Sequence, residues 1–104
     1  MGNTYKSKRW RDKTKLIKRR DNFECQECAR FGRKTDAKLV HHIFPTDLYP
    51  ELFFNNDNLV SLCFKCHELM HDRSTGEVTA LGQDWQKRRK LKIFKNEKNK
   101  NLKN

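Results

Sequence analysis

The segment Cys63–His71 holds two patterns of residues that can bind metal ions. Cys63 and Cys66 form a CxxC pair, and His67 and His71 follow at a spacing of four residues. If this segment is helical, the two histidines lie on one face about 5–6 Å apart, close enough to share a cation. The segment therefore predicts a cysteine site and, beside it, a histidine site.

A second CxxC pair lies upstream and gives the chain the pattern C-x2-C-x34-C-x2-C. Two such pairs supply four thiolates, which can close a tetrahedral zinc site and exclude water from it. Disulfides and a redox role are the alternatives. The N-terminus has no apolar segment typical of a secretory signal, so we expect a cytoplasmic chain with reduced thiols. Neither pair follows a strand within a βαβ pattern, which disfavours a thioredoxin-like role. The expected ligands of a structural zinc are Cys25, Cys28, Cys63 and Cys66.

All four histidines fall in two short segments: His41, His42, His67 and His71. Taken singly, each would more often be an ordinary surface or core residue. The doublet ends an expected strand, where successive side chains point to opposite faces. Only one of its members can therefore join the other two histidines around a metal ion. A metal ion next to a free imidazole is suited to hydrolysis, because the imidazole can take a proton from water.

The composition favours a polyanionic partner. With 24 basic and 13 acidic residues the formal net charge is +11, and the sequence pI is about 9.8. Small basic domains typically bind nucleic acid, although charge can also serve solubility alone. A membrane-surface role is disfavoured because the basic segments lack a broad apolar face, and no apolar run is long enough to span a membrane. The candidate DNA-binding residues are Arg19, Arg20, Lys87, Arg88, Arg89 and Lys90.

One small domain of 104 residues must position these groups. The expected elements are a helix from Ser7 or Lys8 to Arg20 capped by Ser7, strands over 37–44 and 59–62, and helices over 65–72 and 84–94. From residue 95 on, the Asn- and Lys-rich sequence predicts disorder. We divide the domain into a basic N-terminal helix (1–22), a zinc-stapled core (23–76) and a basic C-terminal helix with its tail (77–104).

The order His42, Asn58, His67 resembles the His-Asn-His signature of the HNH, or ββα-metal, endonucleases. The surrounding text, including Val-His-His-Ile and Asp-Asn-Leu-Val-Ser-Leu-Cys, is similar to the cysteine-flanked zinc-knuckle subgroup over about residues 23–72. Together with the pattern Trp10…Arg20-Asp21 before the first cysteine, the chain resembles small HNH proteins of tailed phages. Those proteins are typically encoded beside packaging genes and assist the terminase.

The resemblance implies a role for each matching residue. His42 matches the general base, and Asn58 matches the residue that orients the base through hydrogen bonds to nearby backbone. The ligands of a catalytic divalent ion would be His41, His67 and His71. The implied fold is small α+β: a ββα-metal core with a four-cysteine zinc knuckle, flanked by basic helices. The family implies Mg2+, but a site of three imidazoles is softer and also suits Mn2+, Ni2+, Co2+ or Zn2+.

The leading prediction is a metal-dependent endonuclease that nicks or cuts double-stranded DNA. The resemblance adds a role in packaging, with the terminase large subunit and portal as partners in the cytoplasm of a phage-infected host. The alternative is a non-catalytic four-cysteine zinc module that binds nucleic acid or docks on a larger DNA-processing complex. That alternative explains the charge and the cysteines, but it leaves the four histidines without a role.

Overall fold

The computed structural model describes residues 2–95, and the tail expected to be disordered lies almost entirely outside them. After a short 3-10 turn, η1 (Gly2–Lys6), the helix α1 spans Lys8–Arg20. Its N-cap is Ser7, whose hydroxyl accepts a hydrogen bond from the backbone N–H of Trp10 at 3.1 Å. The predicted helix and its cap are therefore confirmed. The α1 residues that the fold buries are Trp10 and Ile17.

Two short antiparallel strands, β1 (Leu39–His42) and β2 (Leu59–Leu62), form the sheet. The prediction for β2 is confirmed, whereas β1 is shorter than the predicted 37–44. Its regular pairing ends because the Asn58 side chain, rather than a strand backbone, accepts the N–H of Phe44. At the other end, the N–H of Ala37 already bonds to the carbonyl of Phe23. Between the strands lie two 3-10 turns, η2 (Pro50–Leu52) and η3 (Asn56–Asn58).

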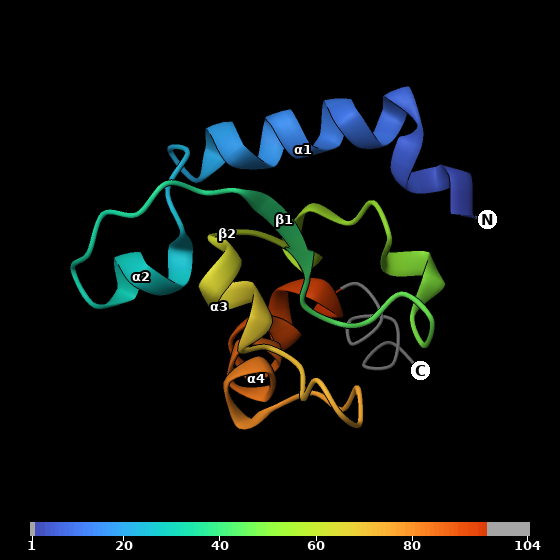
Figure 1. Cartoon of the computed structure of the whole chain (residues 1–104). Coiled ribbons are helices and arrows are strands. Elements are labelled where there is room, and N and C mark those ends of the chain that lie inside the picture. The colour runs from blue at the N-terminus through green and yellow to red at the C-terminus, as the bar shows by residue number, and fades with distance from the viewer. Residues whose placement is uncertain (1, 96–104) are drawn as a thin grey trace.

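The helix α1 lies on one side of the hairpin, and α3 (Phe64–Glu68) and α4 (Ala80–Ile93) lie on the other (Figure 1). The core is accordingly divided into two clusters. A small one joins Trp10 and Ile17 of α1 to Leu59 of β2. The larger one joins the opposite face of the hairpin to the four cysteines and to Trp85. Because side chains alternate along β1, each histidine of the doublet faces a different cluster.

Three helices differ from what the sequence predicted. The helix α2 (Gln26–Arg30) starts directly after Cys25 and was not predicted. The helix α4 (Ala80–Ile93) begins well before the predicted start at Asp84. Its N-cap is Thr79, whose hydroxyl accepts the N–H of Gly82, so Asp84 lies inside the helix and pairs with Arg88.

The helix α3 (Phe64–Glu68) is shorter than the predicted 65–72, and His71 lies beyond it. The chain turns after Glu68 because Thr79 binds the last carbonyls. Its hydroxyl donates to the Leu69 carbonyl at 2.6 Å, and its N–H donates to the Met70 carbonyl at 3.0 Å. His71 then forms an isolated bridge with Val78. The expectation that one helix face aligns His67 and His71 is therefore wrong, because contacts with Thr79 end the helix first. Over residues 2–95, no helix has the length and apolar character to cross a membrane.

Candidate metal and catalytic site

The four cysteines lie together, as the sequence predicts. Their sulfur atoms all lie within 4.8 Å of one another, and the Sγ atoms of Cys28 and Cys66 are 3.7 Å apart. A tetrahedron of four thiolates bound at 2.3 Å has edges of about 3.8 Å, so the cluster fits a tetrahedral metal ion. The two CxxC pairs have the same local structure. In each pair the first cysteine is the N-cap of a helix, and its sulfur accepts a hydrogen bond from the backbone N–H of the second cysteine at 3.5 Å.

The surroundings of the cysteines tie the two halves of the chain together. A hydrogen bond from Thr35 lowers the pKa of Cys28 to about 7, whereas burial raises the pKa of the Cys66 thiol. The buried carboxylate of Glu27 accepts hydrogen bonds from the Trp85 indole at 2.9 Å and from Arg30 at 2.8 Å. The cysteine cluster therefore sits where α2, α3 and α4 meet.

His41 points from β1 toward His67 and His71. Its ring centroid is 5.2 Å from that of His67 and 5.8 Å from that of His71. His41 is only 4% exposed, and this burial lowers its pKa to about 3. Burial also lowers the pKa of His67. Both imidazoles are therefore neutral at neutral pH, the form in which histidine binds metal ions.

The histidine group is more open than the cysteine cluster. Within the described part of the chain, the cysteines are the one group of three or more metal-competent side chains whose ligand atoms all lie within 4.8 Å. The three histidines instead line a cavity of about 390 Å³ together with His42 and Tyr5. Imidazole nitrogens are donors that fit a divalent ion chemically, and the cavity leaves room beside them for a substrate.

His42 points away from the other three histidines, into the α1 side of the hairpin. Its Nε2 lies 3.0 Å from the carbonyl oxygen of Phe53. A carbonyl oxygen only accepts, so Nε2 carries the proton and Nδ1 carries the lone pair. Among residues 2–95, Nδ1 has no hydrogen-bond partner. Burial lowers the pKa of His42, and the bond to Phe53 partly opposes this effect. The arrangement gives a neutral imidazole, fixed at one nitrogen and basic at the other, at the edge of the same cavity.

Asn58 is fully buried and connects the backbone segments around His42. Its Oδ1 accepts the N–H of Phe44 at 2.7 Å, and its Nδ2 donates to the carbonyls of Phe44 at 3.1 Å and Leu52 at 3.3 Å. The segment after β1 is thereby fixed to the segment that carries the Phe53 carbonyl. Asn58 makes no hydrogen bond to the imidazole among residues 2–95. It instead fixes the backbone next to the Phe53 carbonyl, which accepts the hydrogen bond from His42.

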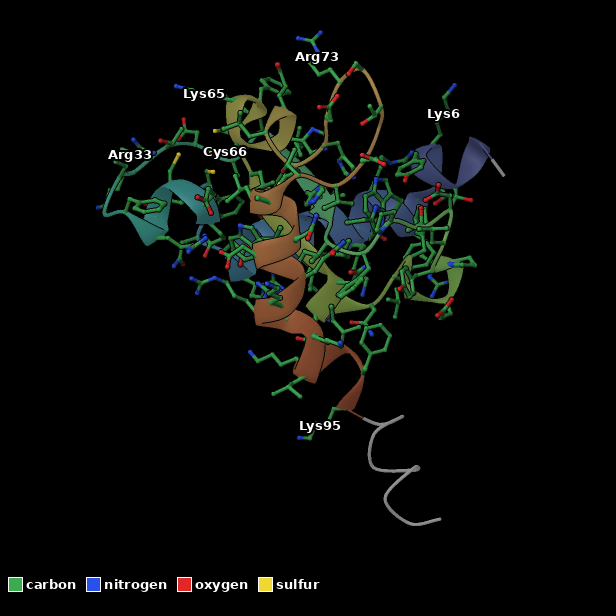
Figure 2. All side chains as sticks on the ribbon, turned by 90° about the horizontal axis from the view of Figure 1, so that it is seen from below. Lys6, Arg33, Lys65, Cys66, Arg73 and Lys95 are labelled. Atoms are coloured by element: carbon green, nitrogen blue, oxygen red, sulfur yellow. The ribbon has the colours of Figure 1, made fainter. Side chains whose placement is uncertain are left out.

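The six candidate DNA-binding residues differ in their surroundings. Arg20 donates to the carbonyls of Asn56 and Leu59 and pairs with Asp21, and Arg89 donates to the carbonyl of Asp57. These two guanidinium groups thus have a structural role as well. Arg88 pairs with Asp84, and the remaining three side chains are exposed: Arg19, Lys87 and Lys90. Other basic side chains project outward from several elements, among them Lys6, Arg33, Lys65 and Arg73 (Figure 2).

Two residues of this site were not anticipated from the sequence. Nothing in the helical pattern of the N-terminal segment indicates that the ring of Trp10 stacks on His42. The acceptor at Phe53 is a backbone carbonyl, so the residue type at this position does not predict it. Only the resemblance, which gives Asn58 an orienting role, points to a backbone acceptor in this region.

Comparisons with known proteins agree with this geometry. The family described as HNH endonuclease matches residues 25–73, which include both cysteine pairs and all four histidines. Among solved structures, the chain is similar to the HNH endonuclease of the deep-sea thermophilic bacteriophage GVE2, crystallised with a manganese ion. The two are 34% identical, the match covers 62% of this chain and 70% of that one, and the TM-score is 0.60. No curated protein sequence matches. The chain belongs to the HNH endonuclease family.

Proposed function

We propose that the protein is a metal-dependent endonuclease that hydrolyses phosphodiester bonds of double-stranded DNA. The observation that carries this proposal is the division of the histidine doublet. His41 lies with His67 and His71, whereas His42 lies apart from them with a free Nδ1. One imidazole is thus available for a metal ion and its neighbour for a proton, which is the combination that phosphodiester hydrolysis requires.

The roles of the side chains follow from this division. His41, His67 and His71 would hold a divalent cation, and such an ion supplies Lewis-acid polarisation of the scissile phosphate. His42 takes a proton from the attacking water at Nδ1, while its Nε2–H stays bonded to Phe53. The depressed pKa of His42 keeps the ring neutral and able to accept that proton at neutral pH.

Asn58 acts indirectly: it fixes the segment whose Phe53 carbonyl accepts the hydrogen bond from His42. The four cysteines would hold a structural zinc, since thiolate ligands at this spacing suit zinc and leave no open position. Mg2+, Mn2+, Ni2+ and Zn2+ are the candidates for the catalytic ion. The manganese ion of the similar phage enzyme supports including Mn2+.

Duplex DNA as substrate is supported by the net charge of +11 and by the family. We further propose that the protein is phage-encoded and assists the terminase large subunit and portal in DNA packaging. The similarity to a bacteriophage enzyme supports a phage origin. Co-purification of the protein with terminase and portal encoded next to it would test the packaging role, and the absence of any complex would contradict it.

A plasmid assay tests the proposed activity. We expect purified protein with Mg2+, Mn2+ or Ni2+ to convert supercoiled plasmid to nicked or linear forms, and EDTA to stop the reaction. His42→Ala should lower the cutting rate at least about a hundredfold, as expected for loss of a general base. The variant should remain folded and keep the zinc content and the DNA affinity of the wild type.

Each outcome of this assay has a definite meaning. Full cutting by His42→Ala would exclude His42 as the base. Wild-type protein that binds DNA but does not cut it with any of these ions would favour the alternative, a non-catalytic zinc module that binds nucleic acid.

A further inference from the structure

The imidazole of His42 is packed within a cluster of aromatic rings. The Trp10 ring lies nearly parallel to it, with centroids 5.0 Å apart and planes 19° apart. Phe53 lies at 4.7 Å, tilted by 49°, and Tyr5 lies at 6.0 Å, edge-on at 77°. Two of these rings belong to the N-terminal segment η1–α1, outside the residues that match the HNH family.

Trp10 is itself held firmly. Its side chain is 8% exposed, and its ring contacts Tyr5 at 5.5 Å, Phe53 at 5.1 Å and Phe54 at 6.2 Å. At the far end of α1, Arg20 donates to the Leu59 carbonyl at 2.7 Å, and Asp21 accepts the Ser61 N–H at 3.0 Å. The helix is thus fixed to β2 at one end and presents a rigid indole face to His42 at the other.

The hydrogen bond from Nε2 to Phe53 fixes His42 at a single point. The ring could still turn about that bond, and the direction of the Nδ1 lone pair would turn with it. A ring stacked on the imidazole removes this freedom, because tilting the imidazole would break the parallel contact. The aromatic cluster therefore restrains the one motion of His42 that its hydrogen bond leaves open.

We propose that Trp10 is a positioning residue for the hydrolytic reaction: its indole face fixes the plane of the His42 imidazole and so aims Nδ1 at the attacking water. This inference rests on the proposed function, because it takes His42 as the base. It also makes the η1–α1 segment part of the catalytic site rather than only a basic helix beside it.

The competing interpretation is that Trp10 only fills the small core. The two interpretations differ in what an apolar replacement without a ring would do. If the side chain only fills space, Trp10→Leu lowers stability but leaves the chemical step unchanged in the folded protein. If the ring aims His42, the same change lowers kcat and leaves KM nearly constant, because substrate binding does not depend on the plane of the base.

The experiment compares Trp10→Leu, Trp10→Phe and the control Phe54→Leu. Phe54 contacts Trp10, and over residues 2–95 it makes no ring contact with His42, so its loss disturbs the cluster without removing the stack. We expect Trp10→Leu to lower kcat about tenfold or more at nearly constant KM, in line with the cost of small misplacements of a reacting group. Trp10→Phe should recover most of that loss, and Phe54→Leu should cut at close to the wild-type rate.

A second readout is independent of cutting. In NMR spectra of protein that keeps the zinc at its cysteines but has no ion at the three histidines, the indole ring current should shift the ring-proton resonances of His42 upfield. These resonances should move downfield in Trp10→Leu, less far in Trp10→Phe, and hardly at all in Phe54→Leu. If Trp10→Leu does not fold, Trp10→Phe decides: a measurable loss of kcat together with a shifted His42 resonance supports the proposal.

Three results would overturn the inference. Trp10→Leu that folds and keeps the wild-type kcat would make the indole a core residue only, and the proposed nuclease would stand. His42 ring-proton resonances that are the same in Trp10→Leu as in the wild type would show that the stack does not exist in solution. A wild-type protein that cuts no DNA would remove the proposed function first, and the positioning role with it.

Discussion

Asn58 shows how a single buried side chain can help to place a second side chain, the proposed base His42, without a hydrogen bond to it among residues 2–95. Its amide uses both ends: the oxygen holds the Phe44 N–H, and the nitrogen holds the carbonyls of Phe44 and Leu52. A buried polar group without a partner costs about 1–3 kcal/mol. This amide therefore stabilises the fold by binding both backbone groups of Phe44, and its bond to Leu52 helps to place the neighbouring Phe53 carbonyl.

We predict that Asn58→Ala lowers the free energy of unfolding by about 2–4 kcal/mol, because it leaves the N–H and the carbonyl of Phe44 without their partner and removes one of the two donors to the Leu52 carbonyl. The cutting rate should fall as well, since the acceptor for His42 Nε2 is then no longer fixed. Chemical denaturation and plasmid cutting measure the two effects. Asn58→Asp keeps an acceptor for the Phe44 N–H but sets a negative charge against two carbonyls, and it should not rescue the protein. Wild-type stability in Asn58→Ala would contradict the role given to this amide.

At the scale of elements, the sequence predicts most strongly what depends on local spacing. The CxxC pairs, the cap at Ser7 and the strand over 59–62 are confirmed because each depends on neighbouring residues. The alternation of side chains along a strand is likewise enough to separate His41 from His42.

What the sequence did not predict depends on contacts between distant segments. The helix that carries His67 ends at Glu68 because Thr79, ten or more residues further on, binds the carbonyls of Leu69 and Met70. No residue within the helix predicts that it ends at Glu68. In the same way, hydrophobic periodicity predicts that Trp10 is buried but cannot say which ring it will meet across the fold.

The attachment of α1 to the hairpin gives a prediction on two adjacent arginines. Arg20 binds the carbonyls of Asn56 and Leu59, whereas its neighbour Arg19 is exposed. We predict that Arg20→Ala lowers the free energy of unfolding by about 1.5–3 kcal/mol, the range for hydrogen bonds made by charged groups. Arg19→Ala should leave stability unchanged and weaken DNA binding instead. Equal stability of the two variants, measured by thermal unfolding, would contradict this assignment.

The junction of α2 and α3 gives a second prediction at this scale. Cys66→Ala should abolish metal binding and unfold the domain, because the cluster joins two segments that are far apart in the chain. Elemental analysis should find one zinc in the wild type and none in the variant, and circular dichroism should show the lost fold. Phe64→Ala is the matched control, since this neighbouring α3 side chain is 62% exposed. A Cys66→Ala protein with wild-type zinc and stability would refute a structural metal.

The whole molecule combines a thin core with a large excess of positive charge. Two apolar clusters lie on opposite sides of one hairpin, and neither is large, so a metal ion bound by the four cysteines would add stability that the fold needs. The basic side chains are spread over several elements rather than gathered on one helix (Figure 2). Such a surface suits binding to the phosphate backbone along a duplex more than reading of particular bases.

DNA binding should therefore weaken steeply with salt, because each phosphate contact releases condensed counterions. The logarithm of the binding constant should fall linearly with the logarithm of salt concentration, with a slope of about −0.9 for each phosphate neutralised. Replacing Lys87 and Lys90, both exposed on α4, by alanine should make that slope shallower by about 1–2. Arg88→Ala should change it less, because this side chain is already paired with Asp84 at 3.1 Å. Fluorescence anisotropy with a labelled duplex measures all three slopes, and a binding constant that does not change with salt would contradict phosphate contact as the basis of DNA binding.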